Sequence, residues 1–169
     1  MIRTFTFRGW AAIVVAATAP PMAPVVAGAM PTLALVNETR SLPRGLYLRR
    51  FGADIRRGAT AAANQPEAAR AYLESLGAPP DMLLLKRVAA VGGDLVCSEP
   101  GRVITPTGEA DVLAQDGRGA ALKAWPDCRR LEAGEVFLLG DAAESFDSRY
   151  FGPVDRSELG GVFTAVATW

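Results

Sequence analysis

At 169 residues, the chain is long enough for one domain with a buried core and a short appendage. Its 18 basic and 18 acidic side chains balance, without a basic stripe or a charged tail, so nucleic-acid binding is not expected. The absence of histidine excludes Ser-His-Asp and Cys-His catalytic sites and His-ligated zinc, and we expect no metal or cofactor site.

The N-terminal part of the chain is apolar, with no charged residue from position 9 to position 36. About 20 apolar residues are enough to cross a bilayer. Arg3 and Arg8 precede the segment, so the positive-inside rule keeps the N-terminus in the cytoplasm and sends residue 37 onward across the membrane. We therefore expect an N-terminal transmembrane anchor within residues 1–36, followed by a domain of residues 37–169.

Four prolines in the same segment leave a second interpretation open, because proline kinks or breaks a helix. Residues 10–19 would then be the core of a cleavable signal peptide, and the small residues 27–29 its cleavage site. We favour the retained anchor because of the candidate site that follows it. Both interpretations place the domain outside the cytoplasm.

The remaining chain is expected to be mainly β with one short helix. The helix is predicted at residues 66–76, with proline in its first turn and Gly77 as its stop. Alternating or apolar runs bounded by turn residues predict strands at 45–51, 82–91, 95–97, 136–139 and 161–169, and hairpins within 101–125.

Lys86, one of only two lysines, lies in the apolar run 82–91. On an alternating strand it shares a face with Leu84 and Val88. Loss of hydration would lower its pKa from about 10.4 to about 7–8, where the amine can take a proton from a serine. The alternative is a lysine at a sheet edge whose amine reaches solvent.

Ser41 follows the apolar segment by five residues, in a Ser-Leu-Pro-Arg-Gly sequence whose proline and glycine constrain the backbone. If the segment spans the membrane, this hydroxyl lies near the outer surface, where an emerging polypeptide presents its cleavage site. An ordinary turn is the alternative. Further on, Asp147 and Arg149 can form a charge-assisted pair that organises a polar loop, unless Asp141 or Asp147 merely caps a turn.

Cys97 and Cys128 match no metal-binding spacing. In an exported domain they can form a disulfide, which we favour, and two separate buried thiols are the alternative.

Three stretches, residues 41–47, residues 85–88 with 93–94, and residues 145–154, resemble in this order the signal peptidase I (S26) family. Within it they are most similar to the conjugative-transfer branch, the TraF-type pilin-processing peptidases. Departures from the housekeeping enzymes, such as Leu42 for the usual methionine and Gly92 for the usual proline, favour this branch. The resemblance implies a signal-peptidase/LexA-like β domain, on a single-pass anchor in the bacterial inner membrane and facing the periplasm.

The resemblance also implies roles for single residues. Ser41 would be the nucleophile and Lys86 the general base, and the Ser41 backbone N–H and the Thr39 hydroxyl would bind the oxyanion. Asp147 looks like the acidic residue that supports the site, and Arg149 like its ion-pair partner. Asp141 and Ser145 would support the site. The positions of Cys97 and Cys128 also look like this branch, which implies that they pair as a disulfide.

These roles imply a membrane-anchored Ser/Lys endopeptidase that processes exported precursor chains, with pilins as the expected substrates, through an acyl-enzyme. Strand addition would bind the substrate, and shallow apolar pockets would accept small residues. Transfer to water gives hydrolysis, and transfer to the substrate's own amine gives a cyclic product. Two alternatives remain: a self-cleaving Ser/Lys protease of the LexA type, and a secreted, disulfide-tied binding module without catalysis, in which Ser41 and Lys86 would lie apart.

Overall fold

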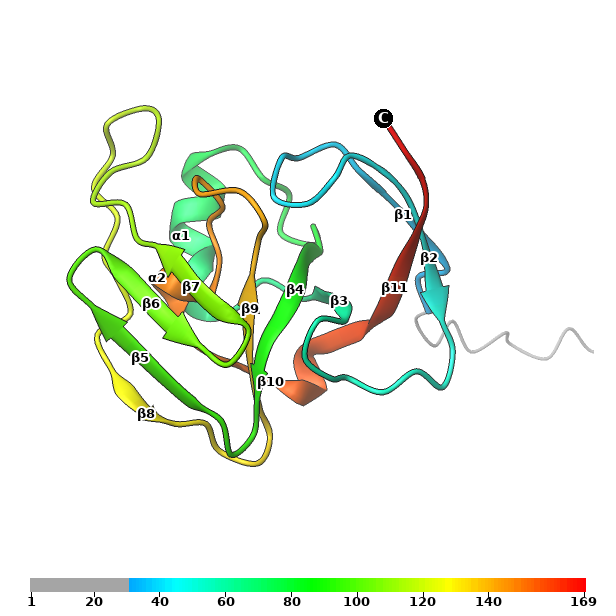
Figure 1. Ribbon diagram of the computed structural model, residues 1–169. Coiled ribbons are helices and arrows are strands. Elements are labelled where there is room, and N and C mark those ends of the chain that lie inside the picture. The colour runs from blue at the N-terminus through cyan, green and yellow to red at the C-terminus, as the bar shows by residue number, and fades with distance from the viewer. Residues whose placement is uncertain (1–30) are drawn as a thin grey trace, which may run out of the picture. The chain divides into compact units, whose positions relative to one another are not determined.

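Two antiparallel sheets dominate the part of the chain that the computed structural model describes, residues 31–169 (Figure 1). The expected transmembrane helix or signal peptide falls largely within residues 1–30, outside the described residues. Among residues 31–169, no helix is both long and apolar enough to cross a membrane.

The larger sheet has seven strands in the order β1-β2-β11-β3-β4-β9-β10. Their bounds are β1 Ala34–Asn37, β2 Gly45–Arg50, β3 Thr60–Ala63, β4 Leu84–Val91, β9 Glu135–Leu139, β10 Val154–Asp155 and β11 Leu159–Thr168. The terminal strand β11 lies between β2 and β3, so it joins the first hairpin to the rest of the sheet. Register shifts in β4 and β11 mark irregularities that bend the sheet.

The smaller sheet has four strands in the order β7-β6-β5-β8. Their bounds are β5 Leu95–Glu99, β6 Arg102–Thr105, β7 Gly108–Asp111 and β8 Cys128–Arg130. Cys97 on β5 lies opposite Cys128 on β8, and the two form a disulfide. The predicted pairing of the cysteines is therefore confirmed.

Three short helices complete the described elements: α1 Glu67–Ser75, α2 Ser148–Phe151 and the 3-10 helix η1 Arg156–Glu158. Helix α1 confirms the helix predicted at residues 66–76, with Pro66 at its N-cap. Helix α2 was not predicted, since it is only four residues long. It begins where the Asp147 carboxylate accepts a hydrogen bond from the Arg149 N–H.

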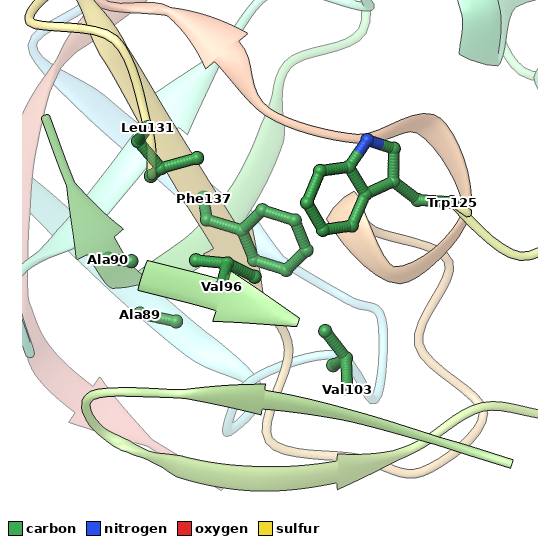
Figure 2. Close-up of a cluster of buried hydrophobic side chains, with 7 residues drawn as sticks. All are labelled: Ala89, Ala90, Val96, Val103, Trp125, Leu131 and Phe137. Carbon is green, nitrogen blue, oxygen red and sulfur yellow. The ribbon is translucent and has the colours of Figure 1, made fainter. Parts of the chain in front are cut away.

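An apolar core joins the two sheets (Figure 2). Trp125 packs against Phe137 of β9, with ring centroids 5.3 Å apart. The remaining members come from β4, β5 and β6 and from the segment before β9: Ala89, Ala90, Val96, Val103 and Leu131. The smaller sheet is therefore fixed to β4, the strand that carries Lys86.

The mainly β prediction is confirmed, and the strands predicted from apolar runs match β2, β4, β5, β9 and β11. Within residues 101–125 the structure has the hairpin β6–β7, whereas residues 112–124 contain only an isolated bridge between Gln115 and Ala121. Strands β1, β3, β8 and β10 were not predicted. Strand β1 overlaps the end of the charge-free stretch 9–36. The compact unit begins at Pro31, whereas the domain was expected from residue 37.

Candidate active site

Ser41 lies in the turn that connects β1 to β2. These strands pair from Ala34 opposite Leu48 to Asn37 opposite Gly45, so residues 38–44 form the connection. Gly45 has a positive φ, and a Cβ on it would meet the backbone of Ala167 on β11. Only glycine lets the end of this turn pack so closely against the last strand.

Lys86 lies on β4 with its amine against two serine hydroxyls. Its Nζ is 2.8 Å from the Ser41 Oγ and 2.7 Å from the Ser145 Oγ. The side chain is 4% exposed. Burial lowers the pKa of Lys86 to about 8, opposed by the charge of Asp147 and aided by that of Arg149. A neutral amine in this position can accept the Ser41 proton while its own N–H donates to Ser145.

Ser145, Asp147 and Arg149 belong to the segment that follows β9. The Asp147 carboxylate accepts hydrogen bonds from the Gly140 N–H and from the backbone and guanidinium of Arg149. Its described hydrogen bonds thus go to the loop itself, whereas Ser145 is the member of this segment that touches Lys86. Asp147 and Arg149 are buried side by side, so the predicted ion pair is present in the structure.

Asp141 links the nucleophile turn to the opposite face of β4. Its backbone N–H donates to the Ser41 carbonyl oxygen over 2.6 Å. Its carboxylate accepts two hydrogen bonds from Arg87, of 2.8 and 2.9 Å. Because both side chains are partly exposed, we assign this ion pair to positioning of the loop and only modest stability.

Thr39 lies next to the nucleophile. Its Oγ1 is 3.4 Å from the Ser41 Oγ and 2.8 Å from the Asn37 Oδ1. The shorter contact means that Asn37 orients this hydroxyl in the resting protein. Apart from the two cysteines, the residues predicted for the site therefore lie on three neighbouring segments: the turn after β1, strand β4 and the segment after β9.

Within residues 31–169, no three His, Cys, Asp or Glu side chains form a group that could hold a metal ion. Two surface grooves, of about 610 and 450 Å³, share Arg87 in their lining. The larger groove also reaches Pro43 in the nucleophile turn, and the smaller one reaches Gly140 and Asp141 in the loop after β9.

Comparison with known proteins bears on this arrangement. The family described as signal peptidase, peptidase S26, matches residues 1–169, the whole chain. The chain belongs to this signal peptidase family. It is similar to two proteins of Escherichia coli named plasmid transfer protein TraF. One is 34% identical over 149 residues, covering 80% of this chain and 84% of the relative. The other is 31% identical over 160 residues, covering 86% and 88%.

The resemblance to TraF-type members of the family is thus confirmed. The Gly93-Asp94 pair of the second matching stretch has a structural role in this chain. The Asp94 carboxylate accepts the Val91 N–H and forms an ion pair with Arg57, which fixes the turn between β4 and β5.

Two residues of the site were not predicted from the sequence. Asn37 is buried, and its side-chain amide donates to the carbonyl oxygens of Thr39, Leu42 and Pro43, so it organises the nucleophile turn from within. An asparagine next to a turn is the usual signal for such an arrangement. Gly140 leaves room for the Ser145 side chain, since a Cβ on it would clash there. Its place directly after a buried strand was the available signal.

Proposed function

We propose that this signal peptidase is a membrane-anchored Ser/Lys endopeptidase that cleaves exported precursor chains in the periplasm, with pilin precursors as the substrate class. The single observation that carries the proposal is the 2.8 Å contact between the Lys86 Nζ and the Ser41 Oγ in a buried setting. Similarity to proteins named for plasmid transfer supports the choice of substrate.

The reaction follows from the chemistry of these groups. Neutral Lys86 takes the Ser41 proton as the Oγ attacks the scissile carbonyl carbon. The Ser41 N–H and the Thr39 hydroxyl stabilise the oxyanion, for which Thr39 turns its hydrogen away from Asn37. Lys86 then returns the proton to the leaving amine, and an acyl-enzyme remains on Ser41.

The second half of the reaction decides the product. Water activated by Lys86 hydrolyses the ester and releases a linear chain. The precursor's own amine, admitted in place of water, forms an amide and releases a cyclic chain. Both outcomes regenerate Ser41 and use the same two residues.

The alternative without catalysis required Ser41 and Lys86 to lie apart. Their hydrogen-bonding distance speaks against it. A self-cleaving protease of the LexA type also fits the dyad, but the whole-chain match to the signal peptidase family favours an enzyme that acts on other chains.

The test is co-expression of the full chain with an exported pilin precursor that carries Ala-x-Ala at its processing site, followed by mass spectrometry of the product. We expect processing by the native chain and by the control Ser75→Ala, a substitution on the exposed end of α1. Ser41→Ala should leave the precursor intact. A cyclic product is lighter by one water than the linear one. Processing by Ser41→Ala would overturn the proposal.

A further inference from the structure

The disulfide closes a segment that lies against the candidate site. Cys97 and Cys128 are 31 positions apart, and the chain between them contains β6, β7 and the irregular residues 112–127. Because the cysteines face each other on paired strands, both ends of this segment are fixed on the smaller sheet.

Residues near the two ends of the irregular part hold Arg149 from two sides. The Asp111 carbonyl oxygen accepts a hydrogen bond of 2.8 Å from the Arg149 Nη1. The Trp125 N–H donates to the Arg149 carbonyl oxygen, also over 2.8 Å. The segment therefore contacts both the side chain and the backbone of this buried arginine.

Two tyrosines add further contacts between the segment and the helices. The Leu113 N–H donates to the Tyr150 hydroxyl of α2 over 3.1 Å. The Tyr72 hydroxyl of α1 donates to the Asp116 carboxylate over 2.9 Å. Both rings also pack on Phe146, the residue directly after Ser145.

Trp125 anchors the segment in the core three residues before Cys128. Its indole packs on Phe137 among the side chains that join the two sheets (Figure 2). Gly152, just after α2, has a positive φ, and a Cβ on it would lie 2.7 Å from the Trp125 ring. The close fit of ring and backbone fixes the position of α2 relative to the segment.

Arg149 connects the segment to Lys86, the proposed general base. Its guanidinium donates to the carbonyl oxygens of Ala142, Ala143 and Ser145, and it pairs with Asp147. The Ser145 hydroxyl in turn accepts the hydrogen bond from Lys86. One continuous set of contacts therefore runs from the disulfide-closed segment through Arg149 and Ser145 to Lys86.

We propose that residues 111–125, enclosed by the Cys97–Cys128 disulfide, form a positioning segment that holds Arg149 in place. Through Arg149, the segment keeps Ser145 against Lys86 and keeps the Lys86 amine buried. The segment touches neither Ser41 nor Lys86 by the hydrogen bonds described here and acts through Arg149. The inference rests on the proposed function, in which Lys86 is the general base.

Opening of the segment has a definite consequence for the amine. Without its bonds to Asp111 and Trp125, Arg149 loosens its hold on the carbonyls of the loop after β9, and water reaches Lys86. Burial is the main cause of the lowered pKa, while the two charged groups that act on this amine, Asp147 and Arg149, oppose each other. Hydration therefore raises the pKa of Lys86 towards its ordinary value.

The composition of the chain permits a direct measurement. Lys86 and Lys123 are its only lysines, so lysine labelled with ¹³C and ¹⁵N gives two side-chain signals in NMR spectra. Lys123 is exposed, within the segment itself, and supplies the reference signal. The full chain is titrated in three forms: oxidised, reduced with dithiothreitol, and as the double variant Cys97→Ser/Cys128→Ser. Dithiothreitol converts the disulfide to two thiols and is itself oxidised to its cyclic disulfide.

We expect the Lys86 signal to titrate near pH 8 in the oxidised protein. In the reduced and doubly substituted forms it should titrate at least about one pH unit higher, which leaves about tenfold less neutral amine at neutral pH. Reoxidation of the reduced protein should restore the first value. A merely structural disulfide would lower the stability of the fold without moving this titration.

A second variant keeps the test decisive if the reduced protein unfolds. Tyr72→Phe/Tyr150→Phe retains the disulfide and the ring packing and removes two of the segment's hydrogen bonds. We expect a smaller shift in the same direction. An unchanged Lys86 titration in every folded form would overturn the positioning role and leave the proposed function standing. An ordinary titration near pH 10.5 already in the oxidised protein would instead overturn Lys86 as the base.

Discussion

Lys86 and Arg87 are neighbours on β4 whose side chains lie in opposite environments, one buried and one partly exposed. The Lys86 amine is buried against two hydroxyls, whereas the Arg87 guanidinium pairs with partly exposed Asp141 on the other face of the strand. A lysine can give up its proton when water is removed, but an arginine stays charged in proteins. The alternation of the strand thus places the residue that can be neutral beside Ser41 and leaves the permanent cation to an ion pair.

The rate of precursor cleavage should rise with pH through about 8, since only the neutral form of Lys86 can accept the Ser41 proton. Lys86→Arg should reduce cleavage at least about 100-fold while leaving the fold intact. The measurement is the initial rate of precursor cleavage between pH 6 and about 10, with far-ultraviolet circular dichroism of the variant as the control. A rate that is flat over this range would contradict the role of the lysine.

Burial of Lys86 also determines the direction in which its contribution to the free energy of unfolding changes with pH. Between pH 8 and 10.5 the unfolded chain keeps a proton on Lys86 that the folded chain has lost. The contribution of Lys86 to the free energy of unfolding is therefore least favourable below pH 8 and improves as the pH rises to 10.5. This cost in the working range is consistent with a side chain kept for chemistry.

At the scale of elements, the site depends on the approach of three segments: the turn after β1, strand β4 and the loop after β9. Gly140 directly follows β9, in contact with the other segments. A Cβ on residue 140 would lie 2.9 Å from the Ser41 carbonyl oxygen and would overlap the Ser145 side chain. Ser145 and the Ser41 backbone would therefore have to shift, and both serine hydroxyls contact Lys86.

Gly140→Ala should therefore reduce cleavage at least about tenfold and destabilise the fold by about 1–3 kcal/mol, as overpacked substitutions do. Gly160→Ala is the matched control, because a Cβ there makes only ordinary contacts, at 3.7 Å or more, and no positive φ is involved. Cleavage rates and urea unfolding of both variants would be compared. Equal activity of the two variants would show that the close approach at Gly140 is not required.

Some elements could be predicted because a local pattern determines them. Strands β4 and β9 are apolar runs ended by glycine, and α1 lies between a proline and a glycine. Strand β3 escaped prediction because its Thr-Ala-Ala-Ala sequence is buried throughout and shows no alternation. Strand β1 escaped because an apolar run that enters a sheet resembles the end of a membrane span until its hydrogen-bond partner, β2, is known.

The site divides in the same way. Ser41, Lys86 and Ser145 could be found because motifs in the correct order carry them, and their side chains lie within hydrogen-bonding distance. Asn37 and Gly140 were missed, because their local signals, an asparagine beside a turn and a glycine after a strand, are common and do not show what surrounds them. Asn37 donates to three carbonyl oxygens, and the Ser145 side chain fills the space beside Gly140. Sequence patterns report chemistry better than they report available space.

At the scale of the whole molecule, charge and apolar surface are unevenly distributed. Four arginines, Arg40, Arg44, Arg49 and Arg50, lie on β2 or in the turn before it, although the entire chain is neutral. Large apolar side chains are exposed on or beside β1, β2 and β11, which are neighbours in the sheet: Leu33, Val36, Leu48, Phe51, Val166 and Trp169. Basic and apolar groups together are typical of surfaces that bind anionic lipid headgroups.

We expect this surface to bind membranes without the N-terminal segment. A chain begun at residue 31 retains Trp125, which is buried, and Trp169, which is 71% exposed. Vesicles of phosphatidylglycerol should shift the Trp169 emission to the blue, and phosphatidylcholine vesicles or high salt should weaken the effect, because the arginines act through screened charge. Trp169→Phe assigns the signal. Circular dichroism first establishes that the shortened chain is folded.

Phe51→Ser should weaken vesicle binding about tenfold or more, since burial of a phenylalanine contributes about 1.5–3 kcal/mol. Leu95→Ser is the matched control, because Leu95 is equally apolar and 50% exposed but lies on β5, in the other sheet. Equal binding by the two variants would mean that exposed apolar area attracts the protein to lipid wherever it lies. A difference between them would mean that the membrane contacts the β1–β2–β11 side, whose turn carries Ser41, so that the nucleophile stays close to the surface where a precursor leaves the bilayer.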